Sequence, residues 1–149
     1  FFLDDLWRYQ AVLMVPAPVV QQKLLLALSG NEQPLQLHES HYSMVAYPWS
    51  QRYQQSNQWA LEALAQAMEP TIRNRGQAQA WLQLQGYQPS DLRIGAMTRL
   101  GGRMTRANIA FDDHPPEKRF AGHIETATVD SILQFLQRNQ LATAPQLVQ

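Results

Sequence analysis

The chain has 149 residues, of which 45% are hydrophobic and 16% are charged, and its formal net charge is zero. This composition is typical of one globular domain, and the balanced charge argues against binding to nucleic acid or to anionic lipid. The sequence contains no cysteine, which excludes disulfides, thiolate metal sites and a cysteine nucleophile.

In chain order, the hydrophobic pattern of the first half predicts a buried strand, an amphipathic helix, two short strands and a longer helix. The expected ranges are 9–15, 19–28, 34–39, 42–47 and 56–68. Pro18 suits the first turn of the first helix, and Gly30 is placed to end it. Alanine and leucine at helical spacing indicate the second helix, which Pro70 closes.

The second half predicts a helix, a turn or short helix, a strand, an exposed loop, a strand and a last helix. The expected ranges are 77–85, 89–91, 108–111, 112–118, 123–128 and 129–139, with Thr128 as the N-cap of the last helix. We expect one α+β domain over 1–141, with a small, mostly antiparallel sheet packed against the helices that start at Ser56 and Val129. Residues 142–149 are expected to form a flexible tail.

Several segments carry a family resemblance. Residues 42–62 read YSMVAYPWSQRYQQSNQWALE, and residues 78–82, 108–115, 126–131 and 1–6 read AQAWL, NIAFDDHP, TATVDS and FFLDDL. These segments resemble a bacterial family of uncharacterised proteins, Domain of Unknown Function 2145. The family is typically exported from Gram-negative cells, so the resemblance implies a periplasmic or otherwise exported protein. We interpret the apolar start without methionine as the cut end of a longer precursor, or as a chain that starts partway through a domain.

A second resemblance concerns residues 55–59, QSNQW. Their spacing is similar to the cysteine motif of circularly permuted papain-like proteins of the NlpC and lecithin-retinol-acyltransferase type. Ser56 stands in the cysteine position and Trp59 in the aromatic position. The resemblance implies a permuted papain-like fold, and leaves open whether its N-terminal strands are present. It also implies a domain without cysteine catalysis that binds a peptide- or amide-containing ligand, such as a cell-wall fragment.

The chemistry of Ser56 leaves alternatives open. Serine has a far higher pKa than cysteine, so the helix terminus that stabilises a thiolate cannot ionise it. An active hydrolase would need a tightly held general base, and His41 is the nearest imidazole in the sequence. Serine is also a favoured N-cap, which is a purely structural role. A structural domain of an envelope assembly is the third hypothesis.

The remaining candidate site residues are polar or aromatic. Trp49 follows a proline near Ser56 and is predicted at the mouth of a pocket, while amides at Asn57 and Gln58 suit hydrogen bonds to a peptide. Asp113 and His114 belong to the densest set of carboxylates and imidazoles, which suits ligand binding or acid–base chemistry. A polar loop beside a strand end is the structural alternative for that set.

No metal and no cofactor are expected. Residues 38–41 read HESH, which lacks the spacing that zinc peptidases need to place two imidazoles one helical turn apart. On a helix, Arg99, Arg103 and Arg106 would form one basic face able to hold a carboxylate or phosphate, but we favour a solvated face or ion pairs with the acids of residues 112–117. No apolar run is long enough to span a membrane, which takes about 18 residues.

Overall fold

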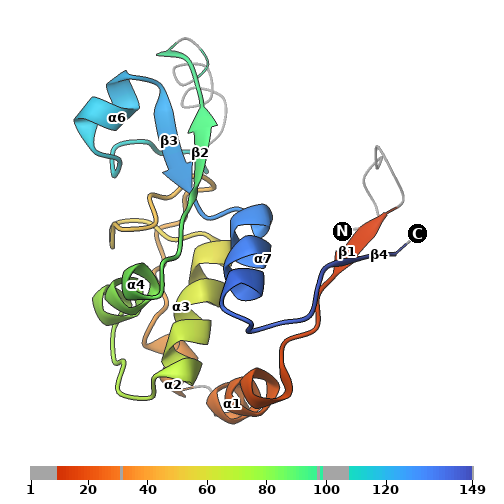
Figure 1. The fold of residues 1–149 in the computed structure, drawn as a ribbon. Helices are drawn as coiled ribbons and strands as arrows, with labels where there is room; N and C mark the ends of the chain where they lie inside the picture. The colour runs from red at the N-terminus through yellow and green to blue at the C-terminus, as the bar shows by residue number, and fades with distance from the viewer. Residues whose placement is uncertain (1–9, 31, 97, 99–107, 149) are drawn as a thin grey trace.

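The computed structural model describes residues 10–30, 32–96, 98 and 108–148. The elements are β1 (Ala11–Leu13), α1 (Pro18–Ser29), α2 (Glu32–Leu35), α3 (Ser56–Met68), α4 (Arg75–Leu84), β2 (Ser90–Arg93), α6 (Pro116–Phe120), β3 (His123–Thr126), α7 (Val129–Arg138) and β4 (Gln146–Val148). Figure 1 shows α3 in the middle of the molecule, between α4 and α7, with β2, β3 and α6 beyond its N-terminal end. The class is α+β, as predicted, and the described strands pair antiparallel, but they form two separate two-stranded sheets instead of the single sheet that was expected to pack against the helices starting at Ser56 and Val129.

The central helix α3 has the predicted bounds. Leu61, Leu64 and Ala65 recur at helical spacing and are at most 5% exposed. The backbone N–H of Glu69 closes the last turn on the carbonyl of Ala65, at 2.8 Å. Because α3 packs against α1, α4 and α7, its apolar residues form the main core together with side chains from those helices.

Side chains cap α4 and α7 at their N-termini. Asn74 Oδ1 accepts a hydrogen bond from the backbone N–H of Gln77 at 3.0 Å. At α7 the predicted cap is confirmed: Thr128 Oγ1 accepts from Ser131 N, and Ser131 Oγ accepts from Thr128 N, both at 3.1 Å. This reciprocal pair satisfies two backbone donors that the helix itself cannot use.

The predicted first helix is confirmed as α1, with Pro18 in its first turn. Val20 is buried, whereas Leu25 and Leu26 are 69% and 78% exposed. Only a narrow stripe of α1 is therefore covered, because α3 is its main neighbour among the described residues.

Strands β2 and β3 form one two-stranded sheet. Leu92 pairs with Ile124 in the antiparallel register, and both contribute to a second core cluster with Val45 and Phe111. The predicted strand at 123–128 is confirmed as β3. Residues 89–91 were expected to form a turn or short helix, but Ser90 and Asp91 belong to β2, because β3 supplies a pairing partner that no local pattern reveals.

Strands β1 and β4 form a second two-stranded sheet, which stands away from the helices in Figure 1. Ala11 pairs with Val148, and every residue of both strands is exposed. The prediction of a buried strand within 9–15 is therefore wrong in its burial, because no other described element covers this sheet. The segment from 142 onward contains β4.

Three other predicted strands are wrong. Residues 34–39 contain the end of α2 and a turn, and 42–47 and 108–111 are irregular. The last two segments lie side by side, but the side chain of Ser43, and not a ladder of backbone hydrogen bonds, joins them at Ala110. Its Oγ donates to Ala110 O at 3.0 Å and accepts from Ala110 N at 3.1 Å. Tertiary bonds of this kind override the β propensity of the sequence.

The expected exposed loop at 112–118 is also wrong. The side chains of Asp113 and His114 are at most 1% exposed, and α6 begins within this range. Pro116 fits the first turn of α6 because that position needs no backbone N–H.

Two sequence expectations concern other parts of the chain. The predicted basic face of Arg99, Arg103 and Arg106 lies outside the described residues. Among the helices that the structure describes, none combines the length and apolar character needed to cross a bilayer.

Candidate functional site

The chain enters α3 through an irregular loop, residues 39–55, that is tied down along its length. Tyr42 and Gln54 form an isolated parallel bridge, and Gln54 N donates to His41 O at 2.9 Å. Further along, Tyr47 N donates to Asp113 Oδ2 at 2.8 Å. Irregular backbone is stable only when its polar groups find partners, and these bonds fix where α3 begins.

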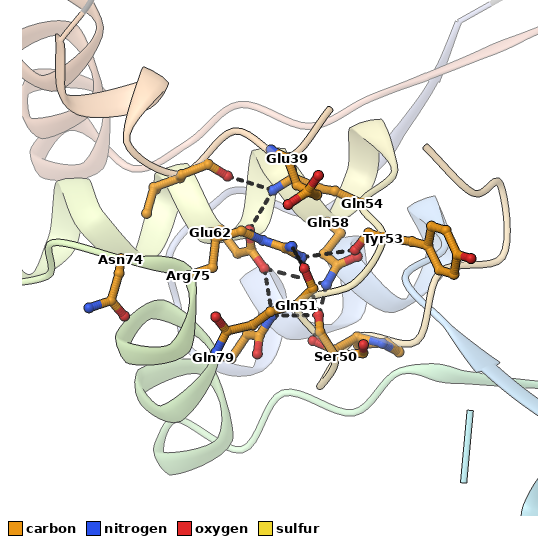
Figure 2. Close-up of polar contacts among 12 residues, drawn as sticks. Glu39, Ser50, Gln51, Tyr53, Gln54, Gln58, Glu62, Asn74, Arg75 and Gln79 are labelled. Carbon is orange, nitrogen blue, oxygen red and sulfur yellow. Dashed lines mark hydrogen bonds and ion pairs between the residues drawn. The ribbon is translucent and has the colours of Figure 1, made fainter. Parts of the chain in front are cut away.

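A buried carboxylate, Glu62 of α3, lies at the centre of a polar network beneath this loop (Figure 2). Arg75 Nε of α4 lies 2.9 Å from Glu62 Oε2, and both side chains are almost completely buried. Amide nitrogens of Gln54 and Gln79 donate to Glu62 at 2.6 and 2.9 Å, and Gln58 donates at 3.4 Å. A buried charge is tolerated only with such pairing, so these five residues act as one unit.

The same network holds the loop. The Arg75 guanidinium donates to the carbonyls of Ser50, Gln51 and Tyr53 at 3.3, 3.0 and 3.1 Å. Figure 2 shows these carbonyls gathered around the guanidinium. Arg75 therefore connects the loop to α3 and α4, and it positions the residues that precede Ser56.

A pocket of about 390 Å³ opens at the start of α3. Its walls come from residues 38–55 and from the first turns of α3: His38, Glu39, Tyr42, Gln54, Gln55, Ser56 and Trp59. Ser56 is the first residue of α3 and is exposed, while the N-cap position belongs to Gln55, whose side chain makes no capping bond. The expectation that Ser56 lies at the tip of a core helix facing a hollow agrees with this placement.

Gln55 is 7% exposed and its amide has a fixed orientation. Its Nε2 donates to Thr126 Oγ1 of β3 at 2.6 Å, and that hydroxyl donates in turn to Ala46 O at 3.1 Å. Because the hydroxyl proton is used on Ala46, Thr126 must accept from the nitrogen of Gln55. The amide oxygen of Gln55 accepts no hydrogen bond within the described part of the chain.

Two imidazoles lie near the pocket. His38 is in its wall, and His41 Nδ1 lies 2.6 Å from Glu39 Oε1, which is also in the wall. The backbone N–H of His41 donates to the same oxygen at 2.9 Å and, with the ring, lowers the pKa of the Glu39 carboxyl. Within the described residues, Ser56 Oγ makes no hydrogen bond to either imidazole.

The other ligand-binding candidates near α3 have structural partners. Asn57 Nδ2 donates to Ala127 O at 3.1 Å, and Gln58 is buried in the Glu62 network. The Trp49 ring packs edge-on against Tyr87, with 5.9 Å between ring centroids. None of Trp49, Asn57 and Gln58 is among the residues that line the pocket, and their contact with a ligand stays a prediction.

Asp113 and His114 lie in a different place. His114 Nε2 donates to Val45 O at 2.8 Å, since a carbonyl can only accept. Asp113 Oδ1 is buried and accepts no hydrogen bond within the described residues, and burial raises the pKa of this carboxyl. Asp113 and His114 could contact a ligand only if this region opened, and their ligand role stays a prediction.

The buried carboxyl predicts a pH effect on stability. A raised folded-state pKa means that Asp113 favours the folded state below its ordinary pKa, and that this contribution is lost as pH rises through the folded-state value. Asp113→Asn, which cannot ionise, is therefore expected to gain stability relative to wild type as pH rises from about 4 to 7. Urea unfolding at several pH values measures this, and a constant difference between the proteins would contradict it.

A second hollow, an apolar groove of about 250 Å³, also has Trp59 in its wall. α1, α3 and α7 line it, with Val20, Leu24, Leu64, Ile132 and Leu136 among the contributing side chains. Trp59 is therefore among the residues that line both hollows.

Sequence reasoning missed much of the pocket. Glu39, Tyr42, Gln54 and Gln55 line it, but their pattern in the sequence resembles any polar loop. Trp59 had a signal, since it lies one turn after Ser56 on the same helix. No group of three or more potential metal-ligating side chains occurs among the described residues.

Comparison with known proteins gives one match. A family model described as "Uncharacterized protein conserved in bacteria (DUF2145)" matches residues 1–136, which is most of the chain. No curated protein and no solved structure matches the chain. The function must therefore be argued from the chemistry of the pocket.

Proposed function

The chain belongs to this family of uncharacterised bacterial proteins (DUF2145), and we propose that it is a papain-like domain without a cysteine nucleophile that binds a peptide- or amide-containing ligand in the cell envelope. The observation that carries the proposal is the exposed Ser56, the first residue of the core helix, in the wall of a pocket of about 390 Å³. The permuted fold and the envelope location rest on the resemblance of the sequence motifs.

The pocket's chemistry supports an amide ligand. Its volume is within the range of small-molecule sites, about 300–1,000 Å³. The oxygen of Gln55 is a fixed acceptor for a ligand N–H, and the hydroxyl of Ser56 can donate to a ligand carbonyl. Tyr42 and Trp59 add aromatic surface for the apolar part of a peptide.

One observation favours hydrolase activity as a second candidate. The bond between Glu39 Oε1 and His41 Nδ1 orients an imidazole as an acid–base group needs, close to the pocket that contains Ser56. A fluorophosphonate separates the two functions. Binding without catalysis leaves the protein mass unchanged, whereas an adduct that disappears in Ser56→Ala would favour the hydrolase.

A titration tests the binding proposal directly. N-acetyl-L-norleucinamide, a neutral compound with two amide groups, is expected to shift the indole N–H resonance of Trp59 in a saturable way. A millimolar dissociation constant is expected, since small ligands gain about 0.3 kcal/mol per heavy atom. The resonance of Trp81 on α4, outside the pocket, is expected to stay in place. Trp59→Phe assigns the signal.

Two serine variants provide the control. Ser56→Leu places a bulky side chain in the pocket wall and is expected to abolish the shift of Trp59. Ser29→Leu makes the same change at an exposed position at the end of α1 and is expected to bind like wild type. Wild-type affinity in Ser56→Leu would locate binding elsewhere. Absence of any Trp59 shift in the wild type would favour a structural role in an envelope assembly.

A further inference from the structure

Glu39 supplies negative charge to the pocket. Among the described residues that line it, Glu39 is the only acid, and none is lysine or arginine. Glu39 has its side chain 27% exposed, so its carboxylate is partly shielded from water. A partly shielded charge attracts a counter-ion more strongly than a fully solvated one does.

The carboxylate of Glu39 is held in place by one of its two oxygens. Oε1 accepts from His41 N at 2.9 Å and lies 2.6 Å from His41 Nδ1. Oε2 makes no hydrogen bond within the described part of the chain. The local turn therefore orients the carboxylate and leaves one oxygen for a ligand. The same contacts lower the pKa of Glu39, which keeps the group ionised.

Two aromatic rings share the wall with this carboxylate. Tyr42, 46% exposed, and Trp59 both line the pocket. Aromatic faces attract cations, Trp most strongly, and a carboxylate beside them adds a direct hydrogen-bond acceptor. A carboxylate with tyrosine and tryptophan is a combination that suits an ammonium group.

The N-terminus of α3 adds a weaker, positive charge to the pocket. A helix N-terminus carries about half a positive charge, and no side chain caps α3. The full charge of Glu39 exceeds this partial charge, and the two charges attract different groups. The helix end suits a ligand carbonyl oxygen, and Glu39 suits a cation.

We propose that the pocket selects amide ligands that also carry an ammonium group, with the ammonium on Glu39 Oε2 between Tyr42 and Trp59. The inference rests on the proposed function, since it names the ligand class of the same pocket. The ligand is then a short peptide with a basic side chain, and its carbonyl lies toward Ser56.

The test compares two probes on the wild-type protein at about pH 8, where the ammonium group of a lysine probe stays charged. N-acetyl-L-lysinamide carries the ammonium, and N-acetyl-L-norleucinamide has the same amides without it. The lysine probe is expected to bind about tenfold more tightly, as judged by the Trp59 resonance. Added salt is expected to weaken only the lysine probe.

Matched variants identify the carboxylate. Glu39→Gln keeps an acceptor for the His41 N–H and is expected to bring the lysine probe down to the affinity of the neutral one. Glu69→Gln is the control. Glu69 accepts hydrogen bonds from Thr71, two residues further on, just as Glu39 does from His41, but it lies at the other end of α3. It is expected to keep the preference for lysine.

The outcomes separate the two proposals. If neither probe shifts Trp59 in the wild type, the proposed function itself is wrong. If both bind equally, or if salt leaves the lysine probe unaffected, the amide pocket stands and the ammonium selection is overturned. A tenfold preference retained in Glu39→Gln would also overturn it, because the selecting charge would lie elsewhere.

Discussion

Glu62→Ala is expected to lower the free energy of unfolding by about 3–5 kcal/mol, because it leaves the Arg75 guanidinium buried without its counter-charge. Arg75 is 6% exposed, so water cannot replace the lost carboxylate. The amide nitrogens of Gln54 and Gln79 lose an acceptor at the same time. Urea unfolding followed by circular dichroism measures the change.

Two comparisons make this result specific to the buried pair. Lys118→Met breaks a partly exposed ion pair of similar length, Lys118 Nζ to Glu125 Oε1 at 2.7 Å, and is expected to cost no more than about 1 kcal/mol. The double variant Glu62→Leu with Arg75→Met removes both buried charges. It is expected to be less destabilised than Glu62→Ala, and a double variant at least as unstable would contradict this account.

Phe135→Ala is expected to destabilise the fold by about 3–5 kcal/mol through loss of buried surface and the cavity left behind. Phe135 of α7 is 2% exposed, and its ring meets Tyr87 edge-on at 5.5 Å between centroids. That pair joins α7 to the chain that leaves α4, so the cavity would open inside the main core.

Phe120→Ala is the matched control, because it removes a phenylalanine side chain from the surface. Phe120 is 73% exposed at the end of α6, and its replacement is expected to change stability by no more than about 0.5 kcal/mol. Thermal and urea unfolding of the two variants side by side measures the contrast. Similar losses in both would contradict the assignment of Phe135 to the core.

The helices were the part of the fold that the sequence predicted best. The bounds of α3 and the capping of α7 by Thr128 follow from local pattern, because helix bonds and caps join residues close in the chain. The segments at 42–47 and 108–111 depend instead on each other. Ser43 binds Ala110 across 67 residues, and no local pattern contains that partner.

The candidate site was predicted in outline only. The place of Ser56 at the start of the core helix came from a short motif, and the structure puts a pocket beside it. Glu39 and Gln55 depend on contacts with His41 and Thr126 for their orientation. The bond from Gln55 spans 71 residues, so its effect on the pocket had no signature in the sequence.

The pairing of β1 with β4 has a consequence for how the chain loses structure. Beside this sheet, Val15 N donates a hydrogen bond to Thr143 Oγ1, 128 residues away in the sequence, so the sheet joins two segments from opposite ends of the described chain. The β1–β4 sheet buries little apolar surface, since all residues of both strands are exposed. We therefore expect the β1–β4 sheet to open before the helices unfold, while the core around α3 stays folded.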